Sequence, residues 1–348
     1  MKPLAPGSFE PCVDRWGRFE ELLPTLEGPV MAIADERVLR LHPHVARALK
    51  RIPTVVALRA GEGAKSLKTL ERLAAAAVTV PRRSTVLAVG GGSIGDVATV
   101  FAHLHKRGAR LIQVPTTWLA AVDSSLGGKG AVNVAGLKNG LGVFHAPLEG
   151  WLCLEIFSTL TPAQLREGQA EAYKMALTLD ERTWRTWRVA RPDASSLIRT
   201  SRALKTAICV KDPYEQRGLR EVFNFGHTFA HVVESVSHYR VRHGEAVALG
   251  MVCALDLGRA LGVTSEAVAE AVEPLLPMAE QARRRLGSVL AKVSTAEVSQ
   301  LLRGDKKGAT KTHTRFILLE KPGHWRSQDV PNEAWHGLFG AWRKGERP

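Results

Sequence analysis

Thr85-Val-Leu-Ala-Val-Gly-Gly-Gly-Ser-Ile-Gly-Asp96 is the stretch that decides the fold of the first half of the chain. A short apolar run leads directly into a glycine-rich loop, and helical spacing follows from Gly95 to Lys106. The glycines match the Gly-x-Gly-x-x-Gly pattern, in which backbone N–H groups approach a pyrophosphate at a helix N-terminus. We therefore predict a strand, a phosphate-binding loop and a helix. The acidic residue expected about 20 positions further on is missing, so a tight turn without a ligand is the alternative.

The same order of strand, polar loop and helix recurs on both sides of this stretch. Three further strands are predicted, at Val30–Ala34, Thr54–Leu58 and Arg110–Val114. They run directly into Asp35, into Gly61-Glu-Gly-Ala-Lys65 and into Pro115-Thr-Thr117. This βαβ rhythm indicates a parallel sheet, and open parallel sheets bind ligands at the carboxyl ends of their strands.

Helical spacing dominates the second half of the chain. The predicted helices are Ala163–Leu179, Ser195–Lys211, Gly226–Ser237 and Gly244–Leu261, and Arg315–Leu319 is the clearest strand there. We predict two domains. Residues 1–155 form an N-terminal Rossmann-like α/β domain with a parallel sheet, and residues 156–348 form a C-terminal, mostly α-helical domain.

The composition limits the kinds of protein and ligand that the sequence allows. The 348 residues are 45% hydrophobic, and no apolar run reaches the ~18 residues that span a bilayer. The N-terminal segment has no apolar signal core, so we expect a cytoplasmic protein without a membrane partner. The net charge of +14 comes from scattered Lys and Arg, which favours a small anionic ligand over nucleic acid.

A second motif group carries potential metal ligands. His227 and His231 are four residues apart, so they share one face of a helix, and His243 follows a short polar gap. Upstream, Glu171 and Lys174 are three apart. A carboxylate and imidazoles on neighbouring helices can hold a divalent metal and leave positions open for substrate. Structural histidines and a surface ion pair are the alternative.

A lysine-containing loop lies between the two motif groups. Asp123-Ser-Ser-Leu-Gly-Gly-Lys129 leads on to Lys138 and Asn139. Two glycines before a lysine indicate a backbone folded tightly around a ligand, and a lysine suits phosphate or carboxylate. Asp123 could bind a sugar hydroxyl or the nicotinamide end of a dinucleotide. An ordinary surface loop is the alternative.

Together these motifs resemble the 3-dehydroquinate synthase family of sugar phosphate cyclases, from about Asp35 to Lys307. The resemblance rests on the glycine-rich loop and on Gln113-Val-Pro-Thr-Thr117, Val122–Lys129, Lys138-Asn139, Glu171-x-x-Lys174, Gly218-Leu-Arg220, Asn224-x-Gly-His227-x-x-x-His231 and His243-Gly-Glu245. It implies NAD and a divalent metal, usually zinc with cobalt as an alternative, and a homodimer. The implied reaction converts 3-deoxy-D-arabino-heptulosonate 7-phosphate to 3-dehydroquinate and phosphate, in the shikimate pathway of aromatic amino acid biosynthesis.

The resemblance also implies roles for individual residues. The metal ligands would be Glu171, His227 and His243. The NAD site would be lined by Asp35, Glu62, Lys65, Gly91, Gly92, Asp96, Thr116, Thr117, Asp123, Lys138, Thr159 and Leu160. The substrate would be surrounded by Arg107, Lys129, Asn139, Lys174, Lys205, Arg220, Asn224, His231 and Lys307, with Arg107 reaching across the dimer interface.

The chain departs from the family pattern in a few places. Gly130 replaces the usual threonine, Trp118 replaces a smaller apolar residue, and the segment Asp212–Arg220 is one residue longer, which affects the register of Lys205 and Glu215. Lys306 and Lys307 are equivalent candidates for one position.

The implied chemistry has no net redox change. It consists of transient oxidation, phosphate elimination, re-reduction and intramolecular aldol closure. Another sugar phosphate cyclase and a metal-dependent alcohol dehydrogenase of related architecture are the alternatives. Ser124-Ser125, Gly127-Gly128 and His231 favour the dehydroquinate branch of the family.

Overall fold

The structure, a computed structural model, describes residues 11–270, 272–287, 289, 293–305, 310 and 312–344. The chain forms two compact units. Unit 1 comprises the chain up to Gly168 together with Ile198–Gln216, and unit 2 comprises Gln169–Leu197 and the chain from Arg217. The domains predicted from the sequence are contiguous, so they do not include this return of residues 198–216 to the first unit.

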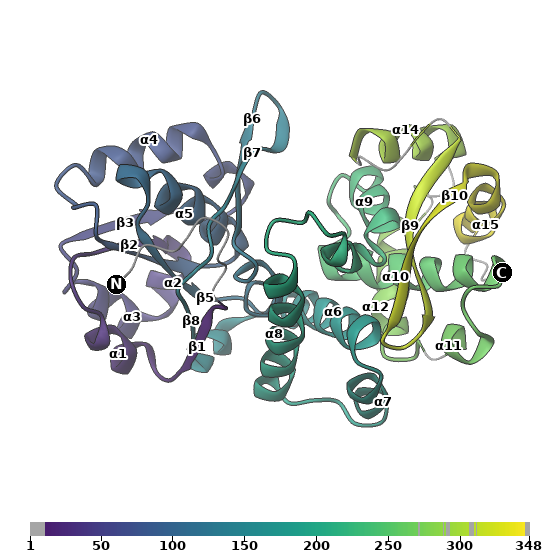
Figure 1. The fold of residues 1–348 in the computed structure, drawn as a ribbon, viewed down its shortest axis with the longest axis horizontal. Helices are drawn as coiled ribbons and strands as arrows, with labels where there is room; N and C mark the ends of the chain where they lie inside the picture. Colours follow the sequence, from purple (N-terminus) through teal and green to yellow (C-terminus); the bar gives the residue numbers. More distant parts are fainter. Residues whose placement is uncertain are drawn as a thin grey trace. The chain divides into compact units, whose positions relative to one another are not determined.

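Unit 1 contains a six-stranded sheet, a separate two-stranded hairpin and the helices that cover the sheet (Figure 1). Its strands are β1 (Val13–Trp16), β2 (Val30–Asp35), β3 (Thr54–Leu58), β4 (Thr85–Gly90), β5 (Arg110–Pro115), β6 (Lys129–Val134), β7 (Leu137–Phe144) and β8 (Glu149–Leu152). Its helices are α1 (Phe19–Leu22), α2 (Glu36–Leu41), α3 (Pro43–Leu49), α4 (Leu67–Ala76) and α5 (Gly92–Leu104), and most of α8 (Ala194–Lys211) belongs to it.

The sheet is parallel throughout and buried on both faces. In β2, Met31 and Ile33 pack into one core, whereas Ala32 and Ala34 pack into the other. In Figure 1, α4 and α5 lie on one side of the sheet and α1 and α3 on the other. Burial on both faces explains why the strands read as continuous apolar runs rather than as alternating patterns.

The strand order fixes where a ligand can bind. The sheet runs β1-β8-β5-β4-β2-β3. Without the edge strand β1, this is the doubly wound order 2-1-3-4-5, in which the direction of winding reverses between β2 and β4. The carboxyl ends of these two strands carry Asp35 and the glycine-rich loop. The four strands predicted from the sequence are all present, and the predicted fold class is confirmed.

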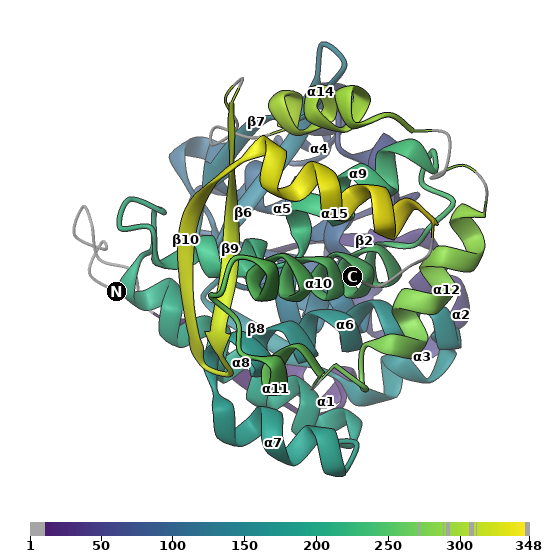
Figure 2. The same ribbon diagram turned by 90° about the vertical axis from the view of Figure 1, so that its right-hand side faces the viewer.

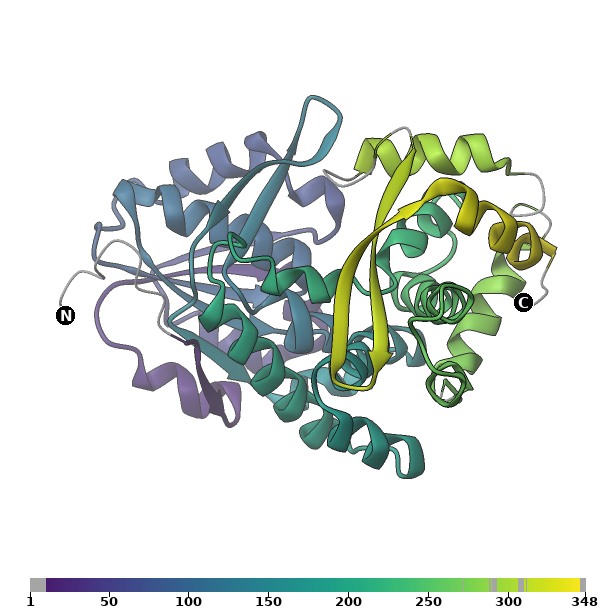
Figure 3. The ribbon, with the colours of Figure 1, turned by 45° about the vertical axis from the view of Figure 1, so that its right-hand side comes forward.

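The remaining strands of unit 1 were not predicted from the sequence. β1 and β8 are four residues long and pair with each other at the sheet edge. β6 and β7 form an antiparallel hairpin that stands out from the sheet as a two-stranded ribbon (Figure 3). Most of β7 is exposed, so its sequence lacks the burial pattern that marks a strand.

Unit 2 is built around one buried helix. Its elements are most of α6 (Pro162–Leu179), α7 (Glu181–Val189), α9 (His227–Val236), α10 (His243–Ala260), α11 (Glu266–Glu270), α12 (Leu276–Leu286), α14 (Thr295–Asp305), α15 (Asn332–Lys344) and the hairpin of β9 (His313–Lys321) and β10 (His324–Pro331). Helix α10 is buried from Gly244 to Gly258 and lies against α9, α12, α15 and β9 (Figure 2). In the described part of the chain, no helix combines the length and apolar character needed to cross a membrane.

Candidate active site

The glycine-rich loop joins β4 to α5 at the winding reversal. Gly91 precedes the helix, and Gly92 is its first residue. A side chain on Gly90 would place its Cβ 2.5 Å from Ile94 Cβ, so the turn requires glycine there. The loop after β5 contacts it, because the Thr116 N–H donates to the Gly90 carbonyl at 3.1 Å. Loops from neighbouring strands therefore meet around the start of α5, where backbone N–H groups favour an anion.

Lys65 and Asp96 form a buried ion pair beside this loop. Their Nζ and Oδ2 atoms are 2.7 Å apart, and the Lys65 side chain is only 4% exposed. Burial raises the pKa of the Asp96 carboxyl, although the Lys65 charge opposes that shift. Lys65 also donates to Asn139 Oδ1. The structure thus joins two residues predicted to bind cofactor to one predicted to bind substrate.

Other residues predicted for the NAD site lie on the same sheet edge. Asp35 caps α2 by accepting from the Arg37 N–H at 2.9 Å, and burial raises the pKa of its carboxyl. Glu62 accepts from Asn133 Nδ2 at 2.9 Å. Thr117, Thr159 and Leu160 follow β5 or β8, whereas Lys138 is an exposed residue of the hairpin strand β7.

Asp123 and Lys205 form another pair in unit 1. Asp123 lies in the short π-helix Ala120–Ser124, a type of distortion that is frequent at functional sites. Lys205, from α8, donates to Asp123 Oδ1 at 2.6 Å and to the Asp123 carbonyl at 2.8 Å. The side chain of Lys205 is 7% exposed. A cofactor candidate and a substrate candidate are therefore in direct contact.

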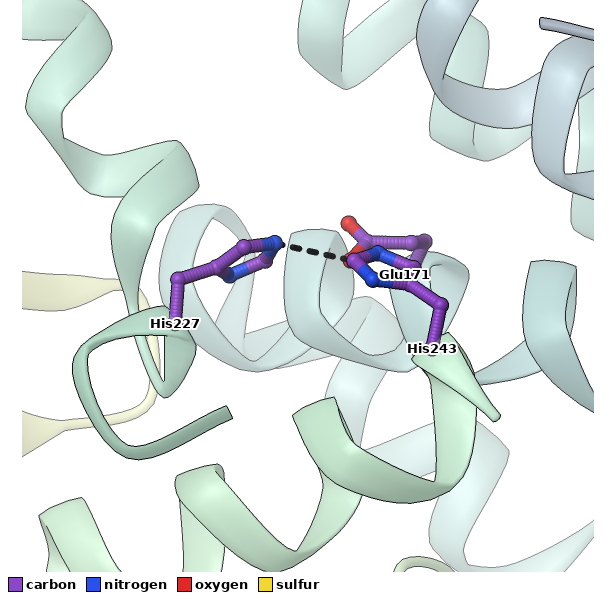
Figure 4. Close-up of side chains that lie close together, drawn as sticks. All are labelled: Glu171, His227 and His243. Atoms are coloured by element: carbon purple, nitrogen blue, oxygen red, sulfur yellow. Dashed lines mark ion pairs between the residues drawn. The ribbon is translucent and has the colours of Figure 1, made fainter. Parts of the chain in front are cut away.

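Glu171, His227 and His243 meet in unit 2 (Figure 4). Glu171 lies in α6, and the histidines are the first residues of α9 and α10. Each histidine Nε2 is 3.4 Å from Glu171 Oε1. Two ligands about 2.1 Å from a tetrahedral zinc lie roughly 3.4 Å apart. The spacing therefore fits a divalent metal.

The contacts around the cluster also fit a metal. His227 Nδ1 is 3.3 Å from the Phe225 carbonyl, and His243 Nδ1 is 2.9 Å from Glu234 Oε1. Metal-binding histidines commonly use their outer nitrogen in this way, which leaves the inner nitrogen for the ion. Both Glu171 oxygens are buried, and among the described residues they make ion-pair contacts but no hydrogen bond. Glu234 was not among the residues predicted from the sequence, although its position seven residues after His227 places it on the same helix face.

His227 and His243 differ in the direction of their pKa shifts. Burial and the Lys174 charge hold the pKa of His227 well below its usual value. Burial lowers the pKa of His243 too, but the adjoining carboxylates of Glu171 and Glu234 overcome this and raise it to about 10. Burial raises the pKa of Glu171, yet Lys174 and the imidazoles outweigh it and hold that pKa well below normal. Glu171 is therefore ionised and His227 neutral, as metal ligands must be.

A second carboxylate–imidazole group lies in unit 1, formed by residues of α1, α3 and the turn after β8. Glu20, His44 and Glu155 bring ligand atoms within 4.8 Å of one another, beside a cavity of about 640 Å³. His44 Nε2 has no hydrogen-bond partner among the described residues. Because it lacks the burial and the oriented histidines of the first group, we do not count it in the candidate active site.

Several predicted substrate residues surround the cluster in unit 2. Lys174 is buried, pairs with Glu171 and donates to the Phe223 carbonyl at 2.6 Å. The His231 ring centroid is 5.5 Å from that of His227. Arg220 is buried in the turn before α9, and Asn224 is exposed at its end.

Two predicted substrate residues are placed differently, and a third falls outside the described residues. Lys129 forms an ion pair with Glu215 near the surface of unit 1. Arg107 is exposed in the turn directly before β5. That turn lies at the amino ends of the strands, opposite the glycine-rich loop, so within its own unit Arg107 does not join the other candidates. Lys307, with its alternative Lys306, lies outside the described residues.

Comparison with known proteins covers both halves of the chain. Residues 55–167 match the family model described as 3-dehydroquinate synthase N-terminal, and residues 168–308 match 3-dehydroquinate synthase C-terminal. A 3-dehydroquinate synthase of Endomicrobium trichonymphae is 38% identical over 306 residues, 84% of this chain and 82% of that protein.

Relatives with other names are similarly close. A 2-epi-valiolone synthase of Actinosynnema mirum is 38% identical over 297 residues, 81% of this chain and 75% of that protein. The crystal structure of 2-deoxy-scyllo-inosose synthase complexed with carbaglucose-6-phosphate, NAD+ and Co2+ superimposes with a TM-score of 0.82 at 26% identity, covering 95% of this chain and 98% of that one. The chain belongs to the 3-dehydroquinate synthase family, a family of sugar phosphate cyclases.

Proposed function

We propose that this protein is a 3-dehydroquinate synthase, a carbon–oxygen lyase that converts 3-deoxy-D-arabino-heptulosonate 7-phosphate to 3-dehydroquinate and phosphate. The group of buried Glu171 with His227 and His243 carries the proposal, because its ligand atoms suit a metal and it adjoins the buried Lys174. The family membership and the named synthases among the relatives support the reaction.

NAD and a divalent metal, zinc or cobalt, are the proposed cofactors. The relative solved with NAD+ and Co2+ supports both. When bound, they would supply reversible oxidation of a substrate hydroxyl and Lewis-acid stabilisation of developing oxyanions. Glu171, His227 and His243 would hold the metal, and the loops around Gly91, Gly92 and Asp96 would hold NAD.

The cations of the site would bind a substrate of high negative charge. Its phosphate carries roughly −1.5 to −2, and its carboxylate adds one more. We assign the carboxylate to buried Arg220, whose planar guanidinium can bind it through two hydrogen bonds. The remaining candidates for substrate binding are Lys129, Asn139, Lys174, Lys205, Asn224 and Lys307.

His231 is proposed to move protons rather than to hold the metal. Its ring lies against His227 on the same face of α9, whereas the Nε2 atoms of His227 and His243 both face Glu171. An imidazole can accept and donate a proton through one bridging water.

A second candidate is cyclisation of a different sugar phosphate. The 2-epi-valiolone synthase and the first 3-dehydroquinate synthase are both 38% identical to this chain, so overall identity does not separate the two reactions. An alcohol dehydrogenase is the third candidate, and it would accumulate NADH, whereas a cyclase regenerates NAD in each turnover.

We further propose that the protein is a cytoplasmic homodimer in which Arg107 contributes to the active site of the partner subunit. We propose no nucleic-acid or membrane partner.

One assay separates these candidates. Purified protein, NAD and zinc are incubated with the heptulosonate 7-phosphate, with a heptulose 7-phosphate that lacks the carboxylate, or with glucose 6-phosphate. The proposal predicts equal amounts of phosphate and dehydroquinate from the first substrate alone, no net NADH, and loss of both products on chelation. Turnover of either other substrate in preference to the first would overturn the assignment.

A further inference from the structure

The π-helix Ala120–Ser124 forms part of the wall beside the glycine-rich loop. A Cβ atom on Gly92 would lie 3.0 Å from Ser124 Oγ, and one on Gly91 would lie 3.3 Å from Thr117 Cγ2. The loop and the segment from Thr117 to Ser124 therefore approach as closely as glycine permits. A shift of the π-helix would move Asp123 and change the space beside the loop.

Arg202, from α8, holds this π-helix at two points. Its Nη1 donates to the Ala121 carbonyl at 2.7 Å and to Ser125 Oγ at 3.0 Å. These acceptors lie on either side of Asp123 in the sequence. Lys205, three residues further along α8, binds Asp123 itself. Helix α8 thus fixes the π-helix through two cationic side chains on one face.

The other edge of the Arg202 guanidinium is fixed by Asp14 of β1. Arg202 Nε donates to Asp14 Oδ2 at 2.8 Å, and Nη2 donates to Oδ1. The pair therefore has the bidentate geometry typical of arginine and a carboxylate. The Arg202 side chain is 0% exposed. A fully buried charge requires such a partner, because an unpaired charge in the interior is strongly destabilising.

Gly150 of β8 provides the space for this guanidinium. It pairs with Asp14 in the sheet. A Cβ on Gly150 would lie 2.3 Å from Arg202 Nη2. Its φ is not among the positive values of the chain, so the backbone conformation does not require glycine. The absence of a side chain is explained instead by the position of Arg202.

We propose that Arg202 is a positioning residue of the cofactor site. Held by Asp14 and by the space at Gly150, it fixes the π-helix so that Asp123, with Lys205, stays beside the glycine-rich loop. The inference rests on the proposed function in one respect, namely that the ligand of this loop is NAD. A buried ion pair is weak evidence for stability alone, since apolar replacements of similar volume are often as stable. The geometry therefore points to a role in placing Asp123.

The test compares NAD affinity with folding. The variant Asp14→Asn/Arg202→Met removes both charges of the pair and keeps the side-chain volumes similar. We expect a melting temperature close to that of the unchanged protein, an NAD dissociation constant raised about tenfold or more in the absence of substrate, and unchanged zinc affinity in unit 2. Arg199→Met is the matched control, because Arg199 lies one turn earlier on α8 and stacks over Trp16 instead of holding the π-helix.

Gly150→Ala is the second variant, and it decides the outcome if the double variant does not fold. It keeps every charge but displaces the guanidinium, so it should weaken NAD binding in the same direction. Folded variants that bind NAD as tightly as the unchanged protein would overturn the positioning role. If the unchanged protein itself binds no NAD, the proposed function fails first, which distinguishes the two results.

Discussion

His243 Nδ1 and Glu234 Oε1 lie 2.9 Å apart, joining the first residue of α10 to the last turn of α9. The contact fixes the imidazole ring with Nε2 toward Glu171. A carboxylate behind a metal-binding histidine sets its tautomer and strengthens it as a ligand. Glu234 therefore belongs to the candidate metal centre through its contact with His243.

Replacing Glu234 with Gln should weaken metal binding about 10- to 100-fold, because the neutral amide polarises the imidazole less. Competition with a chromophoric chelator measures this affinity directly. Glu320→Gln is the control, since Glu320 lies in unit 2 on the exposed face of β9 and pairs only loosely with Arg326 at 3.5 Å. Equal zinc affinities for the two variants would remove Glu234 from the metal centre.

The stability of the metal-free protein should fall as pH rises through the range set by His243. The folded-state pKa is raised from 6.5 to about 10 by its two carboxylate partners. Protonated His243 therefore contributes its full stabilisation of the fold below pH 6.5, and this contribution is lost as the pH rises to about 10. Urea unfolding at pH 6.5, 8 and 9.5 measures the slope. His243→Asn should flatten it, and an unchanged slope in that variant would contradict the assignment.

Zinc binding at pH 7.5 should release about one proton, because His243 must deprotonate to bind the ion. Calorimetric titrations in two buffers of different ionisation enthalpy give the number of protons released. Removal of Glu234 lowers the pKa of His243, so Glu234→Gln should release fewer protons. Zinc binding without proton release would show that His243 is already neutral in the metal-free protein.

Glu171→Gln should destabilise the metal-free protein by about 3–5 kcal/mol, since it leaves the Lys174 ammonium buried without its counter-charge. Adding Lys174→Met should recover most of that loss in urea unfolding. Glu181→Gln is the control, because its ion pair with Arg185 lies on the helix surface and contributes only about 0.3–0.5 kcal/mol. A Glu171 variant as stable as the control would show that water reaches Lys174.

Gly90→Ala should destabilise unit 1 by about 1–3 kcal/mol and weaken NAD binding, because the new methyl group overlaps Ile94. Gly63→Ala, in the loop after β3, is the control, because no atom of the described residues lies within 4 Å of its added Cβ. Urea unfolding and an NAD titration of both variants test this. Similar results for the two would mean that the loop adapts to a side chain.

The sequence was sufficient for the parts of the fold in which burial and periodicity agree. The strands of the central sheet read as apolar runs because both of their faces are covered. The metal candidates were found because His227 and His231 share a helical face and Glu171 lies one turn from Lys174. The structure brings Glu171, His227 and His243 together.

Other features depend on contacts that spacing does not reveal. β1 is short, and its Val13 is exposed, so it has no apolar pattern. Asp14 and Arg202 are 188 residues apart in the chain, and neither belongs to a recognisable motif. Lys129 resembles a ligand-binding lysine in its motif, yet here its partner is Glu215.

Residues 198–216 belong to unit 1 although part of unit 2 precedes them in the chain, and this affects the order in which unit 1 can fold during synthesis. Asp14 and Ala121 belong to the part made first, but their partner Arg202 is added only after unit 2 has begun. During synthesis on the ribosome, the Asp14 carboxylate of unit 1 lacks its Arg202 partner until α8 has been made. A fragment ending at residue 168 would keep the glycine-rich loop and yet lack α8, whose Arg202 and Lys205 hold the segment beside that loop.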